Sequence, residues 1–280
     1  MKNITLDLKH VYSTERDSLG FASYMINYVP HNNRLVGLYR KGGRTKSCYK
    51  AKGELARADG VHKIEFIREG DKLKKTADLS IADMLCEDPR VFLYNNLPHG
   101  IFWTGHNGNF YLIDIENHKI NELKTDSIKK NGKNWGSIVL NEELHIVYRV
   151  HPLIIYRYKA SNHSLELSHK IEYSGAPIRG GTSFVRHHSA WYAVAHHTHS
   201  PHHHTAVLVK IDPDFKKITQ TPLVSTKPLY QKGVLDPLGI YIEESSESIV
   251  FICHWGPSHA SRAPFFHVLE GRIPFSLLNS

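Results

Sequence analysis

The sequence predicts an all-β protein that folds as a single five-bladed β-propeller. A unit recurs five times along the chain, and each copy consists of a short apolar strand, a polar turn and a second apolar strand. The second strand finishes on His, Arg, Tyr or Trp, and no linker separates one copy from the next. Repeats of about 40 to 50 residues with this composition are typical of propeller blades.

The copies can be followed in chain order. The first is the weakest and ends at Tyr39 and Arg40. The other four place their two inner strands over residues 89–106, 134–151, 181–197 and 237–256. Each strand assignment rests on a run of about four to eight apolar and β-branched residues, bounded at both ends by Asn, Gly, Pro, Asp or Ser.

Further apolar runs after each pair supply the outer strands. We place the blades near residues 19–79, 84–125, 132–174, 178–228 and 234–276, so that residues 1–280 form one domain. Residues 1–18 are expected to add a closing outer strand or a loose arm. The one helical turn that we predict lies near Ser80.

Composition and charge exclude several classes of function. The net charge is +8, but the basic runs lie mainly in predicted turns and no nucleic-acid-binding signature accompanies them. No apolar run approaches the roughly 20 residues of a membrane span, and the first residues lack the apolar core of a secretion signal. The three cysteines are far apart, which fits a reducing compartment. We therefore expect a cytoplasmic protein without a membrane span or a nucleic-acid partner.

The polar ends of the repeats indicate where the function lies. Equivalent points of all blades converge on the propeller axis, so five strand ends that carry Arg, His and aromatic residues build one pocket. Guanidinium groups and a lysine suit phosphate, and neutral imidazoles can bond sugar hydroxyls. Salt bridges between blades are the alternative role for the arginines, and packing inside the core is the alternative for each histidine.

Three phrases at the starts of blades are more specific than the general pattern. They are Glu87-Asp88-Pro89-Arg90, Lys133-Asn134-Trp135 and Arg179-Gly180-Gly181-Thr182, in this order, one for each of blades two to four. With them, residues 20–275 resemble the five-bladed propellers of the β-mannoside phosphorylases and related β-mannosyltransferases. The chain departs from that pattern at Gly132, where the family has a glutamate, and in residues 254–259, which contain no carboxylate.

The resemblance implies an enzyme that transfers a hexosyl group, most of all mannosyl, as a glycosyltransferase or a glycoside phosphorylase. Asp88 takes the role of general acid that protonates the leaving oxygen. From Glu87-Asp88 alone, a turn cap is the favoured role for Asp88, and the three blade-opening phrases reverse that preference. A glycoside hydrolase of the same fold is an alternative, but it needs a second carboxylate that the fifth blade does not obviously supply. A non-catalytic glycan-binding propeller is the other alternative.

The expected partners are a sugar phosphate or nucleotide sugar and a glycan acceptor, and no cofactor is implied. The histidine-rich segment 196–204 suggests zinc, but it lacks fixed ligand spacing, cysteines or a His-Glu-x-x-His phrase, so we predict no metal. Trp255, beside His254, is the aromatic side chain that we expect to contact sugar. The predicted substrate-binding residues are Arg40, Glu87, Arg90, His106, Lys133, Asn134, Arg149, His151, Arg179, Thr182, His196, His254 and Trp255.

Overall fold

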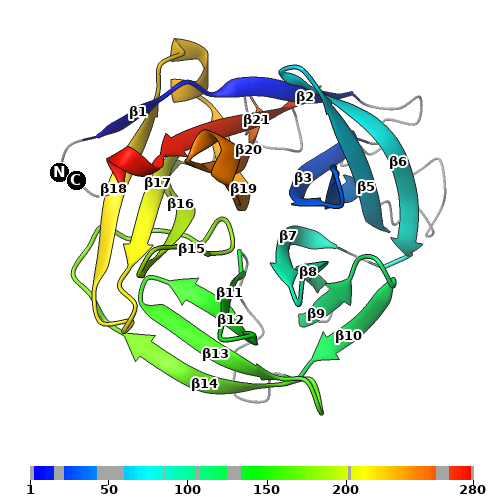
Figure 1. Cartoon of the computed structure of the whole chain (residues 1–280), viewed down its shortest axis with the longest axis vertical. Helices are drawn as coiled ribbons and strands as arrows, with labels where there is room; N and C mark the ends of the chain where they lie inside the picture. The colour runs from blue at the N-terminus through cyan, green and yellow to red at the C-terminus, as the bar shows by residue number, and fades with distance from the viewer. Residues whose placement is uncertain are drawn as a thin grey trace.

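The computed structural model describes residues 3–15, 22–42, 60–84, 86–104, 108–124, 134–200, 203–256 and 265–278. Its strands form sheets arranged in a ring around a central axis, as Figure 1 shows. The all-β propeller predicted from the repeats is confirmed. Strands of one sheet that follow one another in the chain pair antiparallel, and Figure 1 shows them in order from the axis outwards.

The first three sheets are four-stranded and each comes from one continuous stretch of chain. The first contains β3 (Ala22–His31), β4 (Arg34–Gly42), β5 (Gly60–Glu69) and β6 (Lys72–Ala82). The second contains β7 (Glu87–Tyr94), β8 (Leu97–Thr104), β9 (Asn109–Asp114) and β10 (Lys119–Leu123). The third contains β11 (Gly136–Leu140), β12 (Glu143–Val150), β13 (Leu153–Lys159) and β14 (Ser164–Ile171).

Two further groups of four strands complete the ring. The fourth contains β15 (Val185–His187), β16 (Ala190–Ser200), β17 (His203–Ile211) and β18 (Ile218–Ser225). The fifth contains β19 (Val234–Glu243), β20 (Ser248–Gly256), β21 (Phe265–Pro274) and, from the start of the chain, β2 (Lys9–Glu15). One parallel pair, His204 with Val234, joins the fourth group to the fifth.

The N-terminal strands close the ring. β2 pairs antiparallel with β21 as the outermost strand of the fifth sheet, and β1 (Ile4–Leu6) pairs parallel with β18 on the outside of the fourth. Figure 1 shows both strands crossing the top of the molecule from one sheet to the other. The start of the chain thereby ties the last two blades together.

Five apolar clusters fill the interfaces between neighbouring sheets. Ile138 of the third sheet packs with Val207 of the fourth, and Tyr28 of the first packs with Val250 of the fifth. The remaining clusters join the first sheet to the second, the second to the third and the fourth to the fifth. Because each sheet buries both faces, its strands alternate large apolar residues towards the two neighbours.

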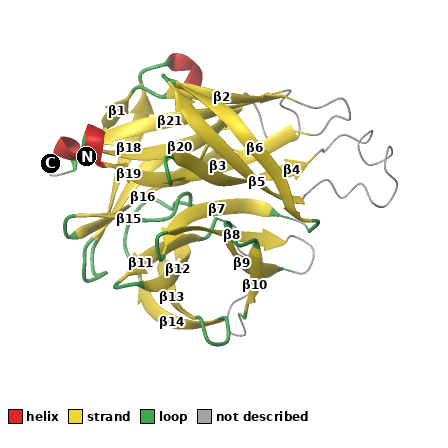
Figure 2. Ribbon diagram, turned by 45° about the vertical axis from the view of Figure 1, so that its right-hand side comes forward, coloured by secondary structure: helices red, strands yellow, loops and turns green. Residues whose placement is uncertain are grey.

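Helical structure is confined to single turns in the described part of the chain. The 3₁₀ turns η2, η3 and η4 cover Pro228–Gln231, Glu244–Ser246 and Phe275–Leu277, and Figure 2 shows them at the periphery. The helical turn predicted near Ser80 is wrong, because β6 continues to Ala82 and a bend follows it. Among the described residues, no helix is long and apolar enough to cross a bilayer.

Candidate functional site

Asp88 lies at an irregular start of the innermost strand β7. Glu87 pairs with Trp103 and Arg90 pairs with Ile101, so that two residues of β7 bulge out opposite one residue of β8. The backbone of Asp88 has a φ of +50°, a left-handed conformation that Asp and Asn tolerate better than most residues. Such bulges turn a side chain out of the regular pleat. The half-buried Asp88 therefore lies outside the regular strand pairing, at the end of the blade near the propeller axis.

Arg90 is a buried side chain at the same end of the propeller axis. Its side chain is 2% exposed and donates to the Asn134 Oδ1 atom at 2.8 Å, to the Pro89 carbonyl at 2.9 Å and to the Gly181 carbonyl. It thus connects the second blade to the chain that enters the third and fourth. Burial lowers the pKa of Arg90, while the negative charges of Asp88 and Asp236 act in the opposite direction.

Asp236, on β19 of the fifth blade, is a carboxylate that the sequence analysis missed. It lies beside a second bulge, between Pro237 and Gly239, and accepts a hydrogen bond from His204 Nδ1 at 2.6 Å. Burial alone would raise the pKa of Asp236. The bond from His204 and the nearby His196 and His254 outweigh burial and hold that pKa below its ordinary value. Asp236 is therefore a partly buried anion.

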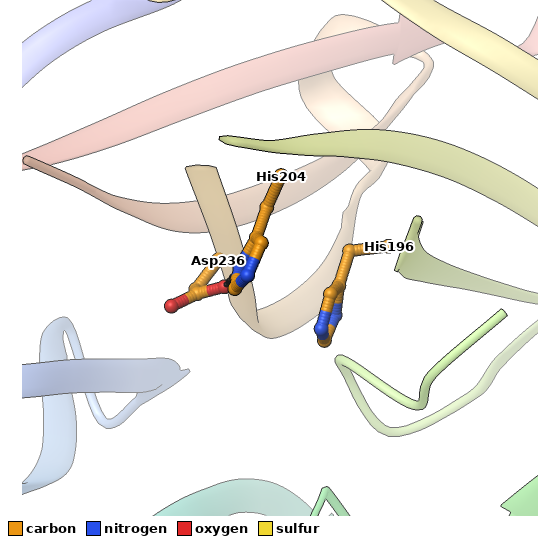
Figure 3. Close-up of side chains that lie close together, drawn as sticks. All are labelled: His196, His204 and Asp236. Atoms are coloured by element: carbon orange, nitrogen blue, oxygen red, sulfur yellow. Dashed lines mark hydrogen bonds and ion pairs between the residues drawn. The ribbon is translucent and has the colours of Figure 1, made fainter. Parts of the chain in front are cut away.

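Two buried histidines accompany this anion. His196 is 4% exposed, and its ring stacks on that of His204 with centroids 5.1 Å apart (Figure 3). His254 is 5% exposed and stacks on Phe266 at 4.5 Å. Among the residues that the structure describes, neither His196 Nδ1 nor His254 Nε2 has a hydrogen-bond partner. Burial lowers the pKa of each ring to about 4, so both are neutral imidazoles at pH 7.

Two more arginines border the cluster. Arg40 is buried, with its Nη1 atom 3.9 Å from Glu87 Oε1. The exposed Arg179 pairs its backbone with that of His196, and its charge contributes to the low pKa of that ring. We call the residues gathered here the axial cluster. Its members are Arg40, Glu87, Asp88, Arg90, Asn134, Arg179, His196, His204, Asp236 and His254.

Four predicted binding residues have other surroundings. Thr182 is buried, donates to the Ser183 carbonyl at 2.7 Å and accepts from the Val194 N–H at 3.0 Å, so it holds the entry to the fourth blade. Trp255 belongs to the core between the fourth and fifth blades, and its Nε1 atom donates to the Lys232 carbonyl at 2.8 Å. The contacts that the structure shows for Thr182 and Trp255 are structural, and their expected contacts with sugar stay predictions.

The other two are Arg149 and His151, at the end of β12. Arg149 is exposed, with its guanidinium 5.5 Å from the centre of the Tyr148 ring. The His151 ring stacks on Tyr173 at 4.5 Å. Both contacts lie within the third blade. His106 and Lys133, the remaining predicted binding residues, lie outside the described residues.

A signal for Asp236 was present in the sequence. The pair Asp88-Pro89 opens the inner strand of the second blade, and Asp236-Pro237 opens that of the fifth. Both pairs adjoin a bulge, and both aspartates interact electrostatically with Arg90. Aligning the repeats on Asp-Pro would have found the second carboxylate. His204 had no comparable signal, because its contact with Asp236 joins two blades.

Solved structures share this fold at low sequence identity. The catalytic domain of an α-L-arabinofuranosidase from Coprinopsis cinerea gives a TM-score of 0.63 at 10% identity, covering 96% of this chain and 97% of that one. An exo-β-1,3-galactanase from Phanerochaete chrysosporium, solved with β-1,3-galactotriose, gives 0.63 at 11% identity, over 97% and 65% respectively. A thermostable family-43 glycoside hydrolase gives 0.59 at 10% identity, over 94% and 93%.

At such identities the likeness shows the propeller fold alone. It does not single out the mannoside phosphorylases that the three sequence phrases resemble. No protein-family model matches the chain, and no curated protein matches it in sequence. The residues of the axial cluster are therefore the basis for inferring the chemistry of this chain.

Proposed function

We propose that the chain is a carbohydrate-active enzyme that hydrolyses glycosidic bonds at the axial cluster. The observation that carries the proposal is that two carboxylates from different blades, Asp88 and Asp236, both act electrostatically on one buried guanidinium, Arg90. Glycoside hydrolysis needs a pair of carboxyl groups, one to protonate the leaving oxygen and one to act on the opposite side of the sugar. The structurally similar enzymes named above support the same class of reaction.

The two carboxyl groups suit different roles. Asp88 is half-buried in the bulge at the start of β7. It can donate a proton to the glycosidic oxygen as the glycosidic bond breaks. Asp236 is held as an anion, so it can accept the proton of the attacking water while the water oxygen bonds to the anomeric carbon. The products are a sugar with a free anomeric hydroxyl and the released alcohol.

The neutral imidazoles of His196 and His254 would recognise the sugar. Each has one buried ring nitrogen without a partner in the described structure, and a hydroxyl group can donate to or accept from such an atom. A site built to bond hydroxyls discriminates strongly against analogues that lack them, because its polar atoms are then left unpaired. We expect a hexose or pentose unit to lie here.

Hydrolysis replaces transfer as the first choice because of Asp236. The sequence favours transfer because its blade-opening phrases resemble the mannoside phosphorylases, and it disfavours hydrolysis because the fifth blade supplies no obvious second carboxylate. A phosphorylase or transferase acting on mannosyl groups stays a second candidate, and a specific observation favours it. Arg40 and the exposed Arg179 add positive charge beside the carboxylates, as a phosphate or sugar phosphate would require.

One experiment separates these activities. The purified protein is incubated with a panel of oligosaccharides and nitrophenyl glycosides, with and without inorganic phosphate. We expect free sugar in phosphate-free buffer, and much less of it from Asp88→Asn and Asp236→Asn. Sugar 1-phosphate that forms only with phosphate present would favour the phosphorylase. No turnover of any glycoside, together with sugar binding, would replace the proposal with a binding module.

A further inference from the structure

Three side chains of the axial cluster form a compact set of metal-binding atoms. His196 on β16, His204 on β17 and Asp236 on β19 each offer one atom, and these three atoms lie within 4.8 Å of one another. Figure 3 shows the two rings beside each other with the carboxylate against His204. The three strands pair directly, because β17 bonds β16 on one side and meets β19 at His204. The fold itself therefore holds the set together.

The hydrogen bonding of this set is incomplete. His204 Nδ1 bonds Asp236, but the Nδ1 atom of His196 is buried and has no partner in the described structure. The His196 residue is only 4% exposed, so bulk water does not satisfy that nitrogen. A buried polar atom without a partner costs free energy and calls for a specific reason. A ligand that binds between the rings would supply one.

We propose that His196, His204 and Asp236 bind a divalent transition-metal ion, with Zn²⁺ as the best match. Two imidazoles and one carboxylate, with a fourth position left to water, are a known ligand set of open zinc sites. Zinc bonds of about 2.0–2.2 Å in a tetrahedral site place ligand atoms about 3.4 Å apart. The three atoms lie within 4.8 Å of one another, so His196 would have to approach by roughly 1 Å, and the hydrogen bond between His204 and Asp236 would have to open with release of its proton.

The surroundings determine which metal is favoured. Mg²⁺ and Ca²⁺ need several oxygen ligands, and this set offers a single carboxylate. The positive charge of Arg179, whose backbone pairs with that of His196, also opposes a cation that binds by charge alone. Imidazole favours zinc and its neighbours in the transition series. We expect zinc binding that is selective over calcium and magnesium, and weaker than in a cysteine-rich structural site.

This inference goes beyond the proposed function and does not depend on it. Metal binding can be measured whether or not the protein cleaves glycosides. A bound ion would occupy His196 and Asp236, so in the metal-bound protein these two groups would be metal ligands and not the sugar contact and the base proposed above.

The test is a titration of metal-free protein with zinc chloride, in which isothermal titration calorimetry measures the heat of binding. The full chain is first dialysed against a chelator and then against chelator-free buffer. One equivalent of Zn²⁺ should bind, and His196→Gln and His204→Gln should each weaken binding at least tenfold. Circular dichroism shows that each variant is folded. Calcium chloride and magnesium chloride should give no comparable heat.

The same hairpin provides a matched control. The triple variant His197→Gln/His199→Gln/His203→Gln removes three neighbouring histidines on β16 and β17 and leaves the proposed ligands intact. It should bind zinc as the wild type does. Loss of binding in this triple variant, with normal binding by His196→Gln, would assign the metal to the surface and overturn the proposal. Absence of zinc binding by the wild type would overturn it as well.

Cobalt gives a second readout that does not rely on affinity. Co²⁺ in a four-coordinate site absorbs visible light far more strongly than hydrated Co²⁺. The wild type and the triple variant should show this band, and folded Asp236→Asn should not. An unchanged band in Asp236→Asn would remove the carboxylate from the site and contradict the proposed ligand set.

Discussion

The two ends of the propeller axis are built by the same inner strands but carry opposite chemistry. The starts of β7 and β19 hold Asp88 and Asp236 in the axial cluster. At the other ends of these strands, Phe92 and Tyr241 line a cavity of about 330 Å³ whose walls are mostly apolar. The remaining blades also contribute to this far cavity, through residues such as Val29, Val139 and Phe184.

The difference lies in the regularity of the backbone. At the polar end the pairing shifts between Tyr24 and Asn27 in β3, and bulges follow Glu87 in β7 and Pro237 in β19. At the apolar end the same strands pair in regular register. A bulge re-aims side chains, whereas regular pairing packs them against the next sheet. Irregular strand starts therefore mark the polar end of the axis, where we propose that the function lies, and regular strand ends mark the apolar end.

The largest effect should come from Asp88→Asn. Asparagine suits the positive φ of this position, so the fold should remain while the proton donor is lost. General acid catalysis contributes about 10²–10⁴-fold, so turnover of the substrate found in the panel should fall at least a hundredfold. Asp214→Asn, an exposed aspartate in an outer turn of the fourth blade, is the control and should keep full activity. Retained turnover in Asp88→Asn would place the acid elsewhere.

A pair of variants on β7 compares the two ends directly. Arg90→Met removes three buried hydrogen bonds and leaves their acceptors unpaired, which should destabilise the fold by about 3 kcal/mol. Phe92→Leu, two residues further on and facing the far cavity, should cost about 1 kcal/mol and leave activity unchanged. Urea unfolding measures both. Equal costs, or an activity loss in Phe92→Leu, would contradict the division between the ends.

The buried histidines should make stability depend on pH. The pKa of His254 is about 4 in the folded protein and 6.5 for an ordinary histidine, so the unfolded chain binds a proton more readily. Stability is therefore full above pH 6.5 and falls as the pH drops towards 4, by about 3 kcal/mol from this ring.

The His254→Gln variant should lose less stability than the wild type between pH 7 and pH 4.5, as urea unfolding would show. His118→Asn, at an exposed turn, should follow the wild type. If the free energy of unfolding fell equally with pH in His254→Gln and in the wild type, the imidazole of His254 would not be buried as described.

The smallest effect should come from Trp255→Phe. The change removes the indole N–H that bonds the Lys232 carbonyl, at a cost of about 1 kcal/mol in unfolding free energy. Because the ring lies in the core, the KM for the glycoside should not change. A large rise in KM with normal stability would restore the sugar contact that was expected from the sequence.

The repeats made the fold predictable, whereas the site was predictable only in part. Strand, turn and strand recur with apolar residues that must face a neighbouring blade, so the architecture follows from local pattern. Asp88 and Arg90 were found through the phrase that opens the second blade, and His196 because it ends an inner strand of the fourth. Asp236 was missed because it lies near the start of the apolar run 235–242. A single carboxylate in that position resembles a turn residue.

Contacts between blades could not be predicted at all. The bond from His204 to Asp236 joins residues that are 32 positions apart, and it depends on how the fourth sheet meets the fifth. Trp255 and His254 are neighbours in sequence, yet one packs in the core and the other joins the axial cluster, because strand side chains alternate between two faces. A repeat pattern places a residue along the axis, but the face that it occupies follows from exact strand register.

The central claim is that sugar binds at the polar end of the axis, between Asp88 and Asp236. A crystal structure of Asp88→Asn soaked with its glycoside substrate tests this most directly. We predict a sugar ring within hydrogen-bond distance of His196 or His254, with its glycosidic oxygen beside residue 88. A sugar bound in the far cavity near Phe92 and Tyr241, or on the outer strands, would contradict the account.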